Sequence, residues 1–143
     1  MKFFDKEHKE FWNEKYKLMR SMGKTDVYYS SLVYVLGICP VTRDHFNRIF
    51  DLKEGLINID CLQDAWQTSS SEKTTRMAFS LWNRCCFDSD EDCEERKASR
   101  YYNPSEIFSC GYAPYFYEGI KIRYPEYTRR NTFEQELDEM EIW

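Results

Sequence analysis

The chain has 143 residues, enough for one domain with a sizeable hydrophobic core. Aromatic residues make up 17% of it, and only five glycines and four prolines occur, which argues against a disordered chain or a turn-rich β-sandwich. The formal net charge of −5 argues against general nucleic-acid binding, because contacts to phosphates need cations.

The distribution of apolar residues argues against two further classes. No run of about 18 apolar residues occurs, so no segment is predicted to span a membrane. The first residues carry charges throughout and lack the apolar stretch of a signal peptide. We therefore expect a cytoplasmic protein whose six cysteines are reduced, namely Cys39, Cys61, Cys85, Cys86, Cys93 and Cys110.

Two helices are predicted in the N-terminal third. Residues 4–22 repeat a hydrophobic pattern at three- and four-residue steps. The repeating face consists of Phe4, His8, Phe11, Trp12, Lys15, Leu18, Met19 and Met22. Residues 27–36 follow a Thr25 or Asp26 cap and end before the break at Pro40. A helix is favoured there, although the valine- and tyrosine-rich sequence leaves a buried strand open.

Shorter elements are predicted in the middle of the chain. Thr42 is expected to cap a helix, and a minor strand is expected around Leu56 to Ile59, after a turn. A serine among residues 69–71 is expected to cap a longer helix. The predicted inward face of that helix consists of Ala78, Leu81, Trp82 and Cys85.

An acidic stretch and two proline-initiated helices follow. Residues 87–95 have no apolar period and predict a surface loop whose acids stay solvated. Asn103 is expected to cap a helix that starts at Pro104, and Pro114 opens another. The predicted apolar face of that last helix is Ala113, Phe116, Tyr117, Ile120 and Tyr124.

These segments predict a mainly α-helical protein with at most a minor strand. We expect a single compact domain of about six to eight short helices over residues 1–131. Residues 132–143 carry five acids and no base, and they are expected to form an acidic tail or a last helix.

The acidic stretch and the cysteines are the candidates for a metal site. Asp88, Asp90 and Asp92 have the spacing of the first calcium ligands of an EF-hand, but Cys93 replaces the turn glycine and Ser99 the bidentate glutamate. Zinc would need the set Cys85, Cys86, Cys93 and Cys110, whose spacing departs from the usual close pairs. We therefore expect no metal and no cofactor.

An enzyme is not the favoured prediction either. Cys39 and His45 lie near each other in sequence, but no nucleophile elbow, metalloprotease motif or P-loop accompanies them. A thiol- or metal-dependent enzyme using this pair or the cysteine cluster is the first alternative. A regulatory DNA-binding protein that uses the basic first helix is the second.

Residues 26–38, 55–83 and 104–127 resemble a family of small uncharacterised bacterial proteins that are carried on mobile genetic elements. The resemblance covers about residues 4–128. It implies a protein that acts by binding a host protein, such as a CRISPR effector nuclease. It assigns no catalytic residues, and the acidic insertion at residues 88–95 departs from the family's pattern.

We therefore predict a non-enzymatic protein that binds a host protein, without direct contacts to nucleic acid. Carboxylates would occupy a basic channel in place of phosphates. The predicted contact residues are Asp88, Asp90, Glu91, Asp92, Glu94 and Glu95, together with the aromatic side chains of Tyr101, Tyr102, Tyr115 and Tyr127. A second acidic cluster consists of Glu134, Glu136, Asp138, Glu139 and Glu141.

Overall fold

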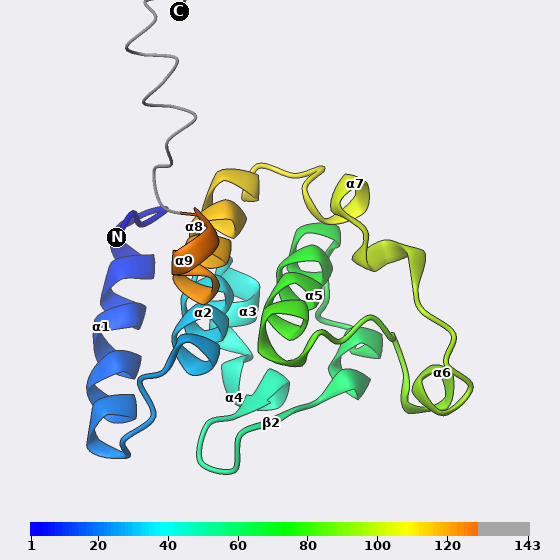
Figure 1. Cartoon of the computed structure of the whole chain (residues 1–143), viewed down its shortest axis with the longest axis horizontal. Helices are drawn as coiled ribbons and strands as arrows, with labels where there is room; N and C mark the ends of the chain where they lie inside the picture. The colour runs from blue at the N-terminus through cyan, green and yellow to red at the C-terminus, as the bar shows by residue number, and fades with distance from the viewer. Residues whose placement is uncertain (129–143) are drawn as a thin grey trace, which may run out of the picture.

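The computed structural model of the chain describes residues 1–128. These residues form one compact, mainly helical domain, as predicted (Figure 1). The predicted acidic tail, residues 132–143, lies outside the described residues. The elements are α1 (Lys6–Ser21), α2 (Val27–Leu36), α3 (Pro40–Asp44), α4 (Phe46–Ile49), β1 (Phe50–Asp51), β2 (Leu56–Ile57), α5 (Ser69–Asn83), α6 (Asp90–Glu94), α7 (Pro104–Ile107), α8 (Ala113–Arg123) and α9 (Pro125–Thr128), with 3₁₀ turns η1 (Ile59–Gln63) and η2 (Arg100–Tyr102).

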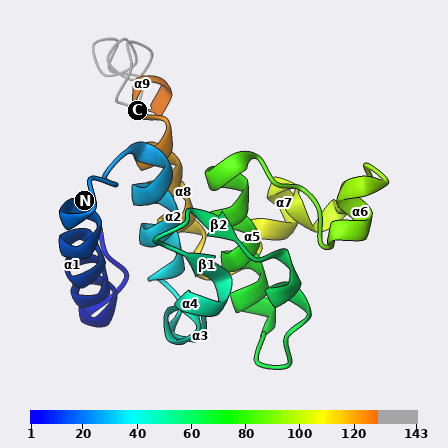
Figure 2. The same cartoon turned by 90° about the horizontal axis from the view of Figure 1, so that it is seen from below.

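Helix α2 is the centre of the domain and packs against α1, α5 and α8 (Figures 1 and 2). Every residue from Ser30 to Leu36 is buried. Asp26 caps the helix, and its carboxylate accepts hydrogen bonds from the backbone N–H groups of Tyr28 and Tyr29. The strand alternative for this segment is therefore excluded. None of the helices in residues 1–128 has the length and apolar character needed to cross a bilayer.

A two-stranded hairpin interrupts the helices. β1 and β2 pair antiparallel, with Phe50 opposite Ile57. The turn between them places Gly55 at φ +68°, a conformation that glycine adopts without steric cost. A Cβ atom at Gly55 would also lie 2.5 Å from the hydroxyl oxygen of Tyr29. The minor strand predicted near Leu56 is present.

The helix caps differ in part from the predicted ones. Thr68, rather than a serine, caps α5, and it forms a capping box in which Ser71 returns the hydrogen bond. Thr42 does not cap a helix. It is buried inside α3, and its hydroxyl donates to the carbonyl of Leu36, because Pro40 already starts that helix. Asn103 and Pro104 open α7 as predicted.

The inward faces of α5 and α8 are close to the predicted ones. In α5, Ala78 and Leu81 are buried, whereas Cys85 is buried beyond the end of the helix. In α8, Phe116 is fully buried, but Tyr117 is 51% exposed, so its predicted place on the apolar face is wrong. The tight packing of α8 on α2 instead depends on Gly119, where a Cβ atom would lie 2.5 Å from Val35.

One buried polar side chain couples α1 to α2. His8 is fully buried, and its Nδ1 accepts a hydrogen bond from the N–H of Phe4. Its Nε2–H therefore donates to the carbonyl of Tyr34, at 2.8 Å. Burial lowers the pKa of His8 below its usual value of 6.5. A second proton would also face the Phe4 N–H, so the folded protein holds this ring neutral.

This arrangement predicts a pH-dependent loss of stability. Below pH 6.5 the unfolded chain binds a proton at His8 that the folded chain takes up only at lower pH, so the free energy of unfolding should fall as the pH falls. The variant His8→Gln should be less stable than wild type at pH 7.5, and the gap should narrow toward pH 5.5. Urea unfolding at both pH values measures it, and a constant gap would contradict the prediction.

Candidate functional site

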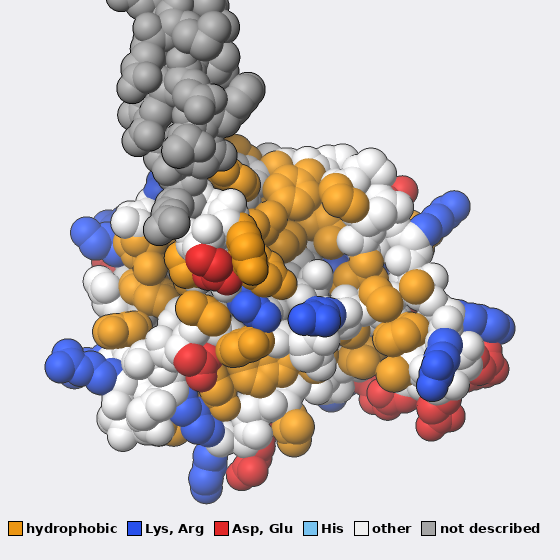
Figure 3. All heavy atoms as spheres, in the orientation of Figure 1, with side chains coloured by type: hydrophobic (Ala, Val, Ile, Leu, Met, Phe, Trp, Pro, Cys, Tyr) orange, Lys and Arg blue, Asp and Glu red, His pale blue; other side chains and the backbone are white. Residues whose placement is uncertain are grey.

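The most prominent charged feature is the acidic loop, defined here as residues 89–98. It projects from one end of the domain, and its short helix α6 buries none of its residues (Figures 1 and 2). Acidic side chains gather at that end of the molecule, next to several basic ones (Figure 3). The loop contains five acids and two bases, a net charge of −3.

Hydrogen bonds close the base of the acidic loop into a neck. The N–H of Ser99 donates to the carbonyl of Cys86 at 2.7 Å. The Ser99 hydroxyl donates to Asp88 Oδ2 at 2.7 Å. The guanidinium of Arg76 on α5 donates to both carboxylate oxygens of Asp88, at 3.0 and 3.4 Å. The two ends of the loop are thus joined to each other and to the body of the domain.

The neck corrects one prediction about the acids. Asp88 was expected to be solvated, but its side chain is only 17% exposed and that of Arg76 only 11%. The physical reason is that a nearly buried guanidinium needs a compensating anion. Asp88 is therefore part of the support of the acidic loop, and its carboxylate is bound within the domain.

Tyr102 also stabilises the neck, through a hydrogen bond to the backbone of Phe87. Its hydroxyl donates to the carbonyl of Phe87 at 3.1 Å, and the Cys85 thiol donates to the same carbonyl at 3.6 Å. Burial raises the pKa values of both Tyr102 and Cys85, so both groups stay neutral. Tyr102 was predicted as a contact residue, but its polar end is used within the domain.

The remaining acids of the cluster are on α6 or, for Glu95, at its C-terminal cap. The sequence predicted a loop for these residues, whereas the structure forms a short helix. Ser89 caps this helix by accepting from the N–H of Asp92 at 3.0 Å. The acids at the first turn are favourable at a helix N-terminus and stabilise the single turn. Asp90, Glu91, Glu94 and Glu95 are exposed, and Glu95 pairs with Lys97 at 2.7 Å.

Tyr101 lies beside the neck over a polar pocket. The guanidinium groups of Arg76 and Arg100 both lie over its ring, with their central carbons 4.9 and 5.0 Å from the ring centre. The ring is 40% exposed. The pocket has a volume of about 330 Å³ and is lined by Ser69, Glu72, Lys73, Arg76, Tyr101 and Glu106. Tyr101 is thus the predicted aromatic residue that the fold places next to the acidic loop with its ring accessible.

The other predicted contact residues do not join this site. Tyr115 packs edge-on against Phe4 near the N-terminus, with ring centres 5.3 Å apart. Tyr127 is on α9 and is 80% exposed. The second acidic cluster, residues 134–141, lies outside the described residues. The loop acids and Tyr101 thus lie on neighbouring parts of the surface, while Tyr115 and Tyr127 belong to other surfaces.

The thiol and histidine candidates have structural contacts. Cys39 is buried, and the His45 ring donates from Nδ1 to the carbonyl of Val41 and stacks on Trp66 at 4.0 Å. Of the four cysteines in the possible zinc set, Cys85 is buried and Cys93 is exposed on α6. Within residues 1–128, no group of three or more histidine, cysteine or acidic side chains is arranged to hold a metal ion.

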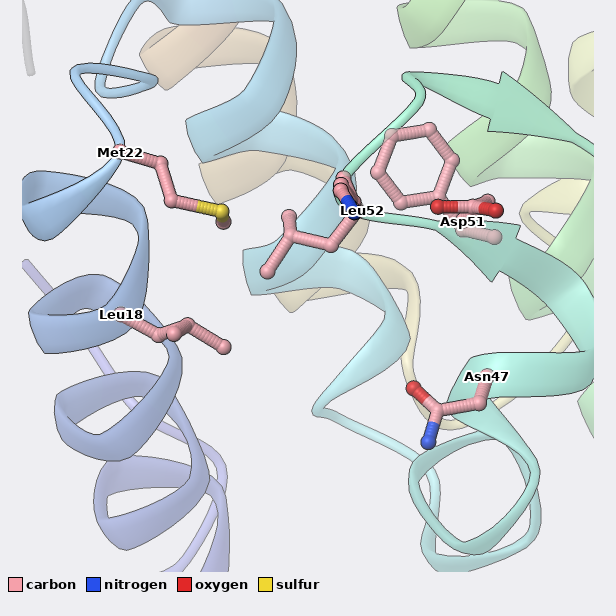
Figure 4. Close-up of a pocket in the computed structure, with 7 residues that line it drawn as sticks. Leu18, Met22, Asn47, Asp51 and Leu52 are labelled. Atoms are coloured by element: carbon pink, nitrogen blue, oxygen red, sulfur yellow. The ribbon is translucent and has the colours of Figure 1, made fainter.

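Sequence reasoning missed an apolar groove between α1 and the hairpin. Leu18 and Met22 point from α1 toward Leu52 (Figure 4). The groove has a volume of about 320 Å³ and is lined by Leu18, Met22, Asn47, Phe50, Asp51, Leu52 and Lys53. The sequence did not indicate this groove, because the helical pattern placed Leu18 on the buried face of α1. In the structure Leu18 is 47% exposed.

Comparison with known proteins places the chain in a family. No curated protein and no solved structure shows significant similarity to it. The sequence model of a family of unknown function (DUF6075) matches residues 1–136, which include all the described elements. The chain therefore belongs to this family.

Proposed function

We propose that the chain acts by binding another protein, without catalysis, and that the acidic loop contacts a basic surface of that partner. The observation that carries the proposal is the closed neck formed by Arg76, Asp88 and Ser99. It holds α6 away from the body, so that the acids on α6 make no buried contacts within the domain.

The acids of the loop would act together as one cluster. A single exposed ion pair contributes about 0–1 kcal/mol. Several carboxylates held on one projection can each face a cation of the partner, and their summed field accelerates association. The neck would strengthen binding further, because a loop that is already held in place loses less conformational entropy when it binds.

The partner that fits best is a host nuclease of a defence system, such as a CRISPR effector. Such an enzyme offers a basic channel for nucleic acid, and carboxylates can occupy the positions of phosphates. The resemblance to proteins of mobile genetic elements supports this proposal, because an element that enters a cell gains from blocking the nuclease. Under this proposal the protein acts in the cytoplasm of the host.

The test neutralises the acidic loop without changing its neck. The loop variant carries Asp90→Asn, Glu91→Gln, Glu94→Gln and Glu95→Gln. A matched control carries Glu7→Gln, Glu10→Gln, Glu54→Gln and Glu126→Gln, which are exposed acids elsewhere and change the net charge equally. Proteins captured from host extract by wild type are identified, and their affinity for each variant is measured at low and moderate salt.

We expect the loop variant to bind the captured nuclease roughly tenfold more weakly, about 1.4 kcal/mol, while the control binds like wild type. Nucleic acid should compete with wild type for the same site. Equal affinities of the two variants, with folding intact, would contradict a role of the loop. The interface would then be sought at exposed aromatic residues such as Tyr127.

A further inference from the structure

Three helices meet at their ends next to α9. The guanidinium of Arg123, at the end of α8, lies over the rings of Tyr28 and Tyr124, with its central carbon 3.9 and 4.5 Å from the ring centres. Its Nε–H donates to the carbonyl of Leu81 at 2.9 Å. Leu81 is in the last turn of α5, where backbone carbonyls lack partners within the helix. Arg123 thus joins α8 to α2 and α5 and is held in one position.

These contacts leave the outer end of the Arg123 guanidinium without a partner. Within residues 1–128, its Nη groups donate no hydrogen bond and form no ion pair with a carboxylate. The only buried polar side-chain atom without a partner in that part of the chain is Nε of Arg43, so the Nη groups of Arg123 reach solvent. A guanidinium fixed in this way is suited to bind an oxyanion through two parallel hydrogen bonds.

The acids of the neighbouring elements do not neutralise Arg123. Glu118 on α8 pairs with Lys121 at 2.7 Å. The carboxylate of Asp26 accepts hydrogen bonds from two backbone N–H groups at the start of α2. Glu126 is exposed on α9 and forms no ion pair among the described residues. The position in front of the Nη groups is therefore complementary to an anionic group from another molecule.

Aromatic side chains surround this cation. Tyr28 is 44% exposed and packs edge-on against Trp82, with ring centres 6.5 Å apart. Tyr127 follows Tyr124 by three residues and is also exposed. On the face where α9 lies toward the viewer, basic side chains lie amid hydrophobic ones (Figures 1 and 3). Tyrosine, tryptophan and arginine are the residues enriched at the energetic centres of protein interfaces. Tyr28, Trp82, Arg123, Tyr124 and Tyr127 are called the Arg123 surface below.

We propose that the Arg123 surface binds an acidic segment of a partner protein, in which an aspartate or glutamate lies beside apolar side chains. The carboxylate would accept two hydrogen bonds from the Nη groups of Arg123. The apolar side chains would cover the exposed rings of Tyr28 and Tyr127. This contact area is separate from the acidic loop and selects the opposite charge.

A nucleic acid fits the Arg123 surface less well. Its affinity depends on several phosphates that are neutralised together. Among the described residues, the surface offers Arg123 and, at the end of α5, the exposed Arg84, because Lys121 is already paired with Glu118. The net charge of −5 also disfavours a long polyanion. A carboxylate with apolar neighbours needs only one cation and an aromatic surface, and both are present.

The experiment selects a displayed library of random peptides on the full chain, and one enriched peptide is synthesised as the probe. We expect enriched sequences to combine aspartate or glutamate with aromatic or aliphatic residues. Arg123→Gln should weaken binding of the probe about tenfold, and so should replacement of the probe's acids by amides. Because both changes remove the same interaction, combining them should weaken binding no further.

Three further variants define what the loss means. Arg123→Lys should restore only part of the affinity, because lysine cannot form the paired hydrogen bonds. Arg20→Gln, at an exposed arginine on α1, changes the net charge equally and should bind the probe like wild type. The loop variant described above should also bind the probe like wild type, which separates this proposal from the role of the acidic loop.

A second measurement uses the wild-type chain, because Arg123 also contributes to the fold. With ¹⁵N-labelled arginine, the probe should shift the side-chain NMR signal of Arg123 and leave that of Arg20 unchanged. The absence of acidic peptides from the selection, or equal binding by Arg123→Gln, would overturn the proposal. Tighter binding of a single-stranded DNA oligonucleotide at Arg123 would do the same. So would a shift of the Arg123 signal, without probe, on replacing the acids of residues 134–141 by amides, because the chain's own tail would then occupy the surface.

Discussion

Replacement of Phe116 by alanine should lower the free energy of unfolding by about 4 kcal/mol. The ring is fully buried where α8 packs against α2. It meets the rings of Phe108 and Tyr112 edge-on, with centres 6.0 and 6.4 Å apart. Alanine would remove these contacts and leave a cavity, because α8 cannot move closer to α2 without pressing Gly119 against Val35.

The neighbouring residue provides the matched control. Tyr117 is on the same helix but is 51% exposed, so Tyr117→Ala should change the free energy of unfolding by about 0.5 kcal/mol. Urea unfolding followed by circular dichroism measures both variants. Similar losses for the two positions would show that α8 does not pack in this orientation.

The second large effect is expected at the neck of the acidic loop. Asp88→Asn keeps the shape of the side chain but leaves the guanidinium of Arg76 without its closest anion. We expect a loss of about 2–3 kcal/mol. The cost stays below that of a fully buried pair because Glu72 lies 3.8 Å from Arg76 and offers partial compensation. Unfolding in urea gives the value.

A control and a local readout separate this effect from a general charge effect. Glu95→Gln removes an acid from the exposed pair with Lys97 and should change stability by less than about 0.5 kcal/mol. Hydrogen exchange should become faster at the Ser99 amide in Asp88→Asn and stay unchanged in Glu95→Gln. Equal stabilities of the two variants would contradict the closed neck.

The elements that the sequence predicted well are those with local signals. Asp26 caps α2, and Asn103 with Pro104 opens α7, because each signal acts within one helical turn. Thr42 resembled a cap by the same rules but is buried inside α3. A local rule cannot decide between a capping and a core position when the neighbouring proline already starts the helix.

The features that escaped prediction depend on contacts between distant residues. Arg76 and Asp88 are twelve residues apart, and nothing in either segment indicates that they pair. Tyr117 was predicted on the apolar face of α8, but α2 approaches that helix most closely at Gly119, where a Cβ atom would lie 2.5 Å from Val35. The groove between α1 and the hairpin forms only because the hairpin packs opposite Leu18, which depends on tertiary packing. The acids of the candidate site could be named from the sequence, but the contacts that support them could not.

The closed neck has a consequence for the evolution of this family. The backbones of Cys86 and Ser99 are hydrogen bonded across the base of the loop. Helix α6, which lies between them in sequence, has no buried residue. Insertions or deletions there change the loop-closure entropy only slowly with length. Residues 89–98 can therefore be replaced as a unit, and we expect relatives to diverge there in length and charge, while Asp88, Ser99 and the helices that support them stay the same.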